Sequence, residues 1–314
     1  MKLRFVINPR SGKRRRNAGI LGLLNGFISE RSLDADIVST EGQGHATEIA
    51  RDAVAMGCLR IVALGGDGTV NEVAQALIHT PAALGLVPCG SGNGLAHHLG
   101  LPTDLSDALE LATGTSGRVA ELDTGTVNGL PFVNAMGLGL DAEVSRRFNR
   151  LAHRGLLAYA RTVLAAFLNR RTERCSISVG GHIETVDALL IAVANSEQYG
   201  NHAKIAPHAR VDDGMLDLVA VRPTGILGAA LLGAQLFLGT IDRSPRVRRL
   251  RGARFLIERP SAGIIHTDGE THMAGASVEV LVRPRSLKFI LPADCPAVAP
   301  AEDGAPAGFA LQLP

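Results

Sequence analysis

Short apolar runs and helical stretches alternate along roughly the first 115 residues. Continuous apolar runs bounded by helices are typical of parallel strands that are covered on both faces. The pattern predicts an α/β domain with a doubly wound parallel sheet. We expect its strands at residues 3–7, 35–39, 60–64 and 84–87, with helices up to about residue 30 and at residues 45–56 and 70–79.

Beyond about residue 119 the predicted strands follow one another directly. Asn128-Gly129 and Gly180-Gly181 are hairpin signals, because these residues adopt the positive φ angles of a tight two-residue turn. Helical stretches at about 141–169 and 224–241 interrupt the strands. The pattern predicts an antiparallel β-sandwich domain with helical insertions. Its further strands are expected at residues 188–194, 216–221, 255–258, 278–283 and 287–291.

This change of pattern divides the chain into parts. We expect an α/β domain at residues 1–118, a β domain at residues 119–292 and a tail rich in Pro and Ala at residues 293–314. A chain of 314 residues, 46% of them hydrophobic, is long enough to bury a core in each domain.

Composition excludes several classes of protein. The formal net charge of +2 and the 20% of charged residues argue against disorder and against a nucleic-acid partner. The four cysteines form no CxxC pair, which indicates reduced thiols in a cytoplasmic protein. The longest apolar stretch, residues 225–239, is short of the roughly 20 residues that span a bilayer. We therefore expect no membrane crossing.

Three loops rich in small residues follow strands of the predicted parallel sheet. They are NPRSGK at residues 8–13, GGDGTVNE at 65–72 and GSGNG at 90–94. Ligands of an open parallel sheet bind at the carboxyl ends of its strands, where these loops lie. Glycine lets the backbone approach a phosphate closely, Asp67 is suited to hold Mg²⁺ through water, and Thr69 stands at a helix start that favours anions.

Each loop alone is more often just a turn, but three at successive strand ends predict a phosphate site. Two better-known nucleotide signatures are absent from the sequence. There is no GxGxxG, which argues against a standard dinucleotide site, and Lys13 is followed by Arg14, so the first loop is not a P-loop.

Five segments together resemble the diacylglycerol kinase catalytic-domain family, which includes bacterial lipid kinases and the sphingosine kinases. The segments are NPRSG, GGDGTVNEV, PCGSGNGLA, VDDGMLDL and HTDGE, in the family's order over residues 2–291. The resemblance implies a lipid kinase with an NAD-kinase-like N-terminal domain. It also implies that ATP binds in the cleft between the domains and that the β domain holds the lipid.

The resemblance also assigns residues. Asp268 and Glu270 match the acidic pair credited with base catalysis, with the choice between them open, and Asp67 completes the catalytic set with Mg²⁺. Asp213 matches a metal-binding Asp, with main-chain carbonyls of Arg210 and Met215 as co-ligands. The nucleotide-binding residues implied are Asn8, Pro9, Arg10, Ser11, Gly12, Thr40, Gly66, Asp67, Gly68, Thr69, Val70, Asn71, Glu72 and Ser91.

One departure from the bacterial pattern concerns the acceptor. Gly94 stands where many bacterial diacylglycerol kinases have Asp, and GSGNG is closer to the form in sphingosine kinases. The NAMGLGLDA segment resembles the one that carries a lipid-head-group Asp in sphingosine kinases. Asp141 is thereby implied to read the polar head of the lipid, which is a diacylglycerol, a sphingoid base or a related lipid.

Six arginines at residues 243–254 follow the apolar stretch at 225–239. A charge run is usually a solvated face, whereas arginines beside apolar surface also suit a peripheral contact with an anionic membrane. We expect that contact, at the inner membrane face. The sequence leaves the oligomeric state open, a homodimer included.

Two rival functions remain open at this point. NAD kinases resemble the fold and share a GGDGT loop, which would give a soluble substrate. The other rival is a lipid-binding regulatory module without catalysis, although every acidic position that the chemistry needs is present.

Overall fold

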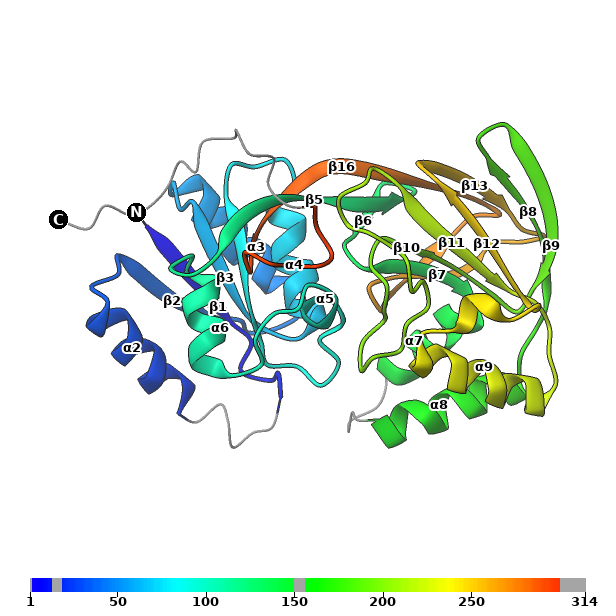
Figure 1. Cartoon of the computed structure of the whole chain (residues 1–314), viewed down its shortest axis with the longest axis horizontal. Helices are drawn as coiled ribbons and strands as arrows, with labels where there is room; N and C mark the ends of the chain where they lie inside the picture. The colour runs from blue at the N-terminus through cyan, green and yellow to red at the C-terminus, as the bar shows by residue number, and fades with distance from the viewer. Residues whose placement is uncertain (1, 13–18, 150–155, 300–314) are drawn as a thin grey trace.

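The computed structural model describes residues 2–12, 19–149 and 156–299, which form two domains side by side (Figure 1). In the N-terminal domain the strand order is β2-β1-β3-β4, and all these neighbours are parallel. The expected parallel sheet is confirmed. Its strands are β1 (Leu3–Ile7), β2 (Ala35–Ser39), β3 (Arg60–Gly65) and β4 (Ala83–Pro88).

Helices cover both faces of this sheet. The helices α3 (His45–Ala55) and α4 (Asp67–Leu77) pack on one side with the core that includes Val6 and Leu84. The helices α2 (Ile20–Glu30) and α6 (Leu105–Ala112) pack on the other side with Phe5 and Val62. A strand sends successive side chains to opposite faces, so continuous apolar runs supply two cores at once.

The long strand β16 (Ser277–Leu291) joins the two domains. It pairs with β4 in the N-terminal domain, with β13 (Arg254–Glu258) in the β domain and with β5 (Arg118–Val127) along its length. Two strands were expected here. The gap between them is an irregularity between Arg283 and Leu287, where the N–H of Arg285 donates to Asp123 instead of to a strand partner.

The β domain is a sandwich, as expected. One layer is the six-stranded antiparallel sheet β12-β11-β10-β7-β14-β15. The other layer belongs to the ten-stranded sheet, and the side chains between the layers include Phe132, Met136, Leu218 and Phe255. The remaining strands are β6 (Leu130–Phe132), β7 (Ala135–Gly139), β8 (Glu173–Val179), β9 (His182–Ala188), β10 (Leu190–Ala194), β11 (Leu216–Val221), β12 (Val247–Gly252), β14 (Gly263–Thr267) and β15 (Glu270–Ala274).

Both predicted hairpins are confirmed. Asn128 and Gly129 connect β5 to β6 with φ angles of 47° and 84°. Gly180 and Gly181 connect β8 to β9 with φ angles of 55° and 83°. Two consecutive positive φ angles are the backbone of a type I′ turn, which matches the twist of paired strands.

The helical insertions lie on one side of the β domain (Figure 1). The expected stretch at 141–169 contains two helices, α7 (Leu140–Asn149) and α8 (Leu156–Leu168), with residues 150–155 outside the described part. The stretch at 224–241 is α9 (Ile226–Leu238), followed by the short helix η1 (Ile241–Arg243). Within the described ranges, every helix falls short of the length and apolarity that a bilayer crossing requires.

Candidate active site

The three glycine-containing loops meet at the carboxyl ends of β1, β3 and β4. The Asn8 side chain of the first loop donates to the Thr69 hydroxyl over 3.0 Å, and its amide oxygen accepts from the Arg10 N–H at 2.9 Å. Gly12, with φ 79°, lies against the carbonyl of Cys89, where a Cβ would clash. The first loop is therefore fixed against the other two. Lys13 lies outside the described residues.

The second and third loops touch through bare backbone. A Cβ on Gly90 would lie 2.5 Å from the Cα of Gly66 and 2.7 Å from the amide oxygen of Asn93. The Asn93 side chain closes the third loop, since it accepts from the Gly90 N–H and donates to the Gly90 carbonyl, each over 3.0 Å. Glycine at position 90 is thus a requirement of loop packing, and a Cβ on Gly66 would be tight, at 3.1 Å from the Cα of Gly90.

The substitution Gly90→Ala is expected to weaken ATP binding. The added methyl group must push two backbones apart, and overpacking of this kind costs about 1–3 kcal/mol. If the distortion falls on the binding conformation, the loss in affinity is about 5- to 150-fold. Calorimetric titration with ATP measures it. Gly26→Ala in α2 is the matched control, because nothing lies within 4 Å of its Cβ, and unchanged binding in both variants would contradict the prediction.

Asp67 begins α4, and its carboxylate accepts backbone N–H bonds from Gly94 and Leu95 at the start of α5 (Gly94–His98). The pKa of Asp67 is raised to about 6, chiefly by burial and to a smaller extent by the negative charge of Asp268 in the other domain, while the backbone N–H bonds oppose the shift. The two carboxylates belong to opposite domains, and the charge of Asp268 is felt at Asp67.

Asp268 stands in the turn between β14 and β15, with φ 48° followed by 86° at Gly269. Its Oδ2 accepts from the N–H of Val133 at 2.7 Å. Its Oδ1 accepts from Asn134 and Ala135 at 2.8 and 2.9 Å. Burial raises the pKa of Asp268, although these three N–H donors counteract it. These donors could not be predicted from local sequence, because they come from a segment more than 130 residues away.

Glu270, two residues later, accepts a hydrogen bond from Gln43 over 2.5 Å. Gln43 precedes α3 in the N-terminal domain, so the acidic turn contacts both domains. The structure therefore brings Asp67, Asp268 and Glu270 to one junction, while the choice of base between the last two stays a prediction.

Asp141 lies in a buried network of polar side chains at the start of α7. Its Oδ2 accepts from the Tyr199 hydroxyl at 2.6 Å and lies 3.0 Å from Nε2 of His266. The N–H of Gly269 donates to Nδ1 of His266 over 3.3 Å, so this ring nitrogen acts as an acceptor. Gly137 leaves the room for this contact, since its Cβ would clash with both side chains.

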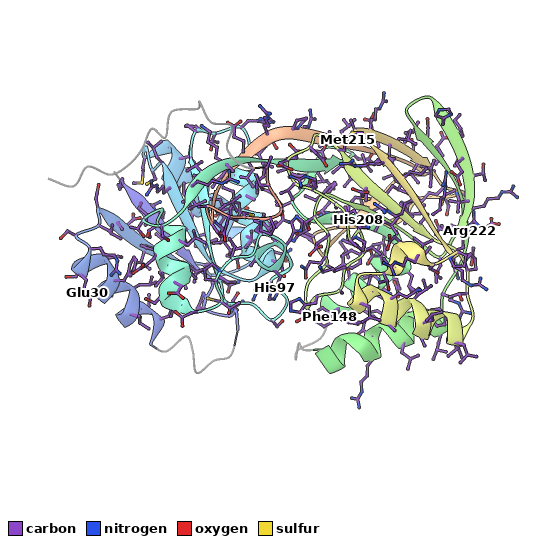
Figure 2. All side chains as sticks on the ribbon, viewed as in Figure 1. Glu30, His97, Phe148, His208, Met215 and Arg222 are labelled. Atoms are coloured by element: carbon purple, nitrogen blue, oxygen red, sulfur yellow. The ribbon has the colours of Figure 1, made fainter. Side chains whose placement is uncertain are left out.

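This network links the acidic turn to the third loop. A Cβ on Gly94 would lie 2.9 Å from the backbone carbonyl of Tyr199. A side chain as large as the Asp expected from many bacterial diacylglycerol kinases therefore does not fit at position 94 unless Tyr199 moves. The N–H of Asn201 also donates to the Gly92 carbonyl over 3.0 Å. Figure 2 shows His97 at the junction of the domains, where its ring lies 4.5 Å from that of His202.

Sequence reasoning missed His266 and Tyr199 as site residues. His266 stands inside the quoted HTDGE segment, and that position was the available signal. Tyr199 carries no motif, because its role depends on folding against α7.

The other predicted nucleotide residues have varied surroundings. Thr40 is buried, and its N–H donates to the Ile7 carbonyl over 2.8 Å. Glu72 accepts from the N–H of Ala46 at the start of α3 over 3.0 Å, so its carboxylate stabilises that helix end. Val70 and Asn71 are buried, whereas Ser91 and Gly68 are exposed. Their roles toward a nucleotide stay predictions.

The predicted metal turn has its own partners. Asp213 forms an ion pair with Arg251 and accepts from the Met215 N–H over 3.1 Å. The N–H of Gly214 donates to the buried Asp123 over 2.6 Å. Arg251 already balances the charge of Asp213, so metal binding here requires Arg251 to move. Figure 2 shows Met215 on the β-domain side of β16.

Asn195 connects this turn to the acidic turn. Its side-chain N–H group donates to the carbonyls of Asp123 and Val133, each over 2.8 Å. Asp123 accepts a hydrogen bond from the Gly214 N–H of the predicted metal turn, and the Val133 N–H donates to Asp268. Across the described residues, no group of three or more His, Cys, Asp and Glu side chains is arranged to hold a metal ion.

Comparison with protein-family models gives two matches that follow the two domains. The diacylglycerol kinase catalytic domain matches residues 2–127. The YegS C-terminal NAD kinase beta sandwich-like domain matches residues 134–291.

Curated relatives and solved structures agree with these matches. A protein of Enterobacter sp. named "Probable lipid kinase YegS-like" is 30% identical over 81% of this chain and 85% of its own length. A diacylglycerol kinase of Bacillus anthracis shares the fold with a TM-score of 0.70 at 23% identity, over 95% of this chain and 98% of its own. An NAD kinase of Archaeoglobus fulgidus, solved with ATP, has a TM-score of 0.53 at 13% identity, over 92% and 93%.

Proposed function

The chain belongs to the diacylglycerol kinase catalytic-domain family and is an ATP-dependent lipid kinase, and we propose that its acceptor is a hydroxyl of a diacylglycerol, a sphingoid base or a related lipid. The observation that carries this proposal is the hydrogen bond over 2.5 Å from Gln43 to Glu270, which places the acidic turn against the domain of the three loops. Gln43 belongs to the phosphate-loop domain and Glu270 to the β domain, so each domain supplies half of a phosphoryl-transfer site.

The residues at the junction fit Mg²⁺ as a cofactor. Carboxylates are the hard oxygen donors that Mg²⁺ prefers, and Mg²⁺ is usually held by one or two carboxylates together with substrate phosphates. Asp67 would hold it, directly or through water. Mg²⁺ bound there supplies positive charge that neutralises the developing charge on the phosphates.

The protein's own groups explain the rest of the reaction. Backbone N–H groups of the first and third loops, with the start of α4, line the place where phosphate oxygens bind. Phosphoryl transfer requires little covalent work beyond a base that accepts the proton of the acceptor hydroxyl. Asp268 or Glu270 takes that proton. The Asp141–His266 contact and the Gly269 hydrogen bond hold the acidic turn in position for it.

Asp141 is proposed to read the lipid head group through the Tyr199 hydroxyl that it holds. The carboxylate is buried and already engaged with Tyr199 and His266. A polar head group at this place therefore contacts the network that positions the catalytic turn.

A transfer assay with radiolabelled ATP and Mg²⁺ tests the function. The acceptors are diacylglycerol, monoacylglycerol, sphingosine, ceramide and phosphatidylglycerol, with NAD as the soluble control. Label in one lipid, lost in Asp268→Ala, is the expected result and names the acceptor. Label in NADP alone would overturn the proposal, as would ATP binding without label in any lipid.

A further inference from the structure

Helix α9 presents an apolar face to solvent. It has no charged residue, and of its residues, all of which the structure describes, Leu232 alone is buried. Its exposed side chains include Leu227 at 88%, Leu238 at 75% and Leu231 at 60% of their full area, with Ile226 and Phe237 beside them. At 3.6 residues per turn these five lie on one face of the helix. An apolar face of this size is typical of a contact surface.

Helix α8 extends this surface. Leu164 and Leu168 are 55% and 60% exposed. The end of α8 is tied to the start of α9, because Arg170 donates to the Thr224 carbonyl over 3.2 Å. Both helices lie on the same side of the β domain (Figure 1). The exposed apolar residues of the two helices are called the α8–α9 face below. They are Leu164, Leu168, Ile226, Leu227, Leu231, Phe237 and Leu238.

The border of the α8–α9 face is basic. Over residues 161–171 and 222–246 the one acidic residue is Asp242, which pairs with His208 and Arg249. The exposed arginines in these ranges are Arg161, Arg170, Arg171, Arg222, Arg243 and Arg246. Two copies of this face brought together would oppose like charges. An anionic lipid surface offers the complementary charge and an apolar interior.

The remaining arginines of the basic run serve the fold instead. Arg248, Arg249 and Arg251 on β12 pair with Glu184, Asp217 and Asp213. Arg254 on β13 pairs with Glu279. Membrane contact was expected of the whole run. We now propose it only for the arginines at the ends of α8 and α9, because the others form ion pairs within the fold.

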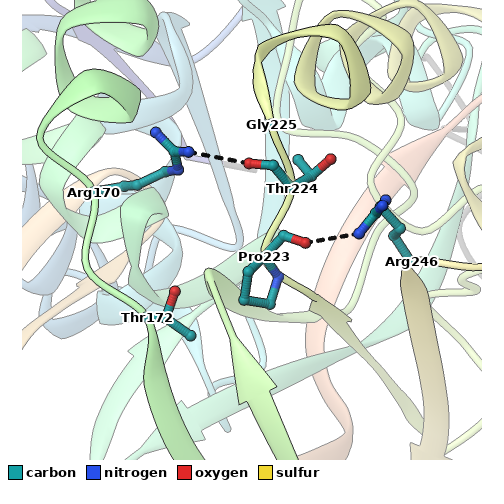
Figure 3. Close-up of a pocket in the computed structure, with 6 residues that line it drawn as sticks. All are labelled: Arg170, Thr172, Pro223, Thr224, Gly225 and Arg246. Carbon is teal, nitrogen blue, oxygen red and sulfur yellow. Dashed lines mark hydrogen bonds between the residues drawn. The ribbon is translucent and has the colours of Figure 1, made fainter.

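A pocket lies where α8 ends and α9 begins (Figure 3). Two arginines on its wall are fixed by backbone carbonyls: Arg170 donates to Phe167 and Thr224, and Arg246 donates to Pro223 over 2.9 Å. The Arg170 guanidinium also stacks on the Phe167 ring at 4.0 Å. A guanidinium has five N–H donors, so most of the donors of both groups remain for a ligand.

Two further features of this pocket point to an anion. Gly225 on its wall is the residue before α9, where the N–H groups of the first helical turn point outward and favour negative charge. Thr224 is 7% exposed, and its hydroxyl has no hydrogen-bond partner among the described residues. Guanidiniums and a helix start are the chemistry that recognises a phosphate.

We infer that the α8–α9 face docks on an anionic phospholipid bilayer, with its leucines in the acyl region and a phospholipid phosphate in the pocket between Arg170 and Arg246. Ile226 and Leu227 directly follow Gly225 of the pocket wall in sequence. When α9 lies in the membrane interface, a phosphate bound in the pocket is therefore at the level of the lipid head groups. This docking goes beyond phosphoryl transfer and is measured without turnover.

Vesicle co-sedimentation without ATP tests the apolar part. The full chain is expected to sediment with vesicles of phosphatidylglycerol and phosphatidylcholine, and weakly with phosphatidylcholine alone. The double variant Leu227→Gln, Leu231→Gln is expected to lose on the order of tenfold or more in partitioning. Ile183→Gln on β9 is the matched control, since Ile183 is 73% exposed outside the face. Equal binding by the double variant and the control would overturn the inference.

A second pair of variants tests the pocket. Each of two double variants removes two positive charges from the border. The first combines Arg170→Gln with Arg246→Gln at the pocket, and the second combines Arg222→Gln with Arg243→Gln outside it. The first pair is expected to lose on the order of tenfold more vesicle binding than the second. Equal losses would overturn the pocket and leave a diffuse charge effect. Soluble glycerol phosphate is expected not to displace the protein, and displacement by it would show a free-phosphate site.

Sedimentation velocity addresses a second copy as the occupant. Wild type and the Leu227→Gln, Leu231→Gln variant are expected to have the same mass in solution. A dimer that this variant converts to a monomer, together with no vesicle binding by wild type, would assign the face to self-association and overturn the inference. Circular dichroism of each variant checks that the exposed substitutions leave the fold intact.

Discussion

Replacing Asp268 with Asn is expected to slow phosphoryl transfer to the lipid by about 10²- to 10⁴-fold, the usual contribution of a positioned base. The carboxylate is held by the N–H groups of Val133, Asn134 and Ala135. An amide keeps one acceptor oxygen, but its NH₂ group opposes one of these donors. The variant therefore loses both negative charge and part of the support of the turn.

The matched variant is Glu270→Gln, because its carboxylate is held by one side chain, Gln43, among the described residues. Glutamine at 270 leaves the turn in place and removes the charge alone. If Asp268 is the base, Asp268→Asn loses activity by about 10²-fold or more and Glu270→Gln by less than about tenfold. The reverse order assigns the base to Glu270.

Single-turnover kinetics with saturating ATP separates this effect from binding. Losses below tenfold in both variants would contradict base catalysis by the acidic turn. The pH profile gives a second readout, because the base must be ionised and burial raises the pKa of Asp268. The acidic limb of the wild-type profile is expected to disappear in whichever variant lacks the base.

Local pattern was enough to predict the parallel sheet and the tight turns. The strands β1 and β2 begin and end at the predicted residues, because each is an apolar run that ends in turn residues. The hairpin at Asn128 follows from the chemistry of two residues. Such features depend on neighbours in sequence, which a pattern reports directly.

Long-range pairing could not be predicted in this way. The strand β16 joins the two domains by pairing with β4, about 200 positions earlier, and the interruption after Arg283 concealed its continuity. The strands β14 and β15 lack a strong alternation of apolar residues, because they contain polar residues such as His266 and His272. Their pairing depends on β7, which is itself weakly marked by sequence.

The residues of the candidate site differ in the same way in how far local sequence predicts them. Glycine at 66 and 90 and the acidic turn were found from motifs. The contact of Asp141 with His266, and the N–H donors around Asp268, arise only when segments from different parts of the chain fold together. The raised pKa of Asp67 likewise depends on folding, through its burial and, to a smaller extent, through Asp268 of the other domain.

Replacing Asp67 with Asn is expected to abolish most activity while it stabilises the fold at neutral pH. Burial places the folded-state pKa of Asp67 at about 6, above the ordinary value of 3.8. The folded state therefore binds the proton more tightly than the unfolded chain, so ionisation above pH 6 costs stability. Asparagine carries no charge and removes that cost, which is about 1–3 kcal/mol for a shift of this size.

The pH dependence identifies the cause. Below about pH 4 both states of the wild type are protonated, so the stabilisation by asparagine is expected to vanish there. It grows as pH rises from 4 to 6 and is complete above 6. Urea unfolding of both proteins at a series of pH values, without nucleotide or Mg²⁺, measures the difference. Asp52→Asn on the exposed side of α3 is the control, with an expected change within about 0.5 kcal/mol.

The same substitution removes a carboxylate at the domain junction. ATP-dependent transfer is expected to fall about 10²-fold or more, because one charge that would hold Mg²⁺ is lost. Gain of stability with loss of activity is the mark of a charge kept for function at a cost to folding. A less stable Asp67→Asn variant at pH 7 would mean that the N–H bonds from Gly94 and Leu95 outweigh the burial of charge, and Asp67 would then be a structural cap of α5.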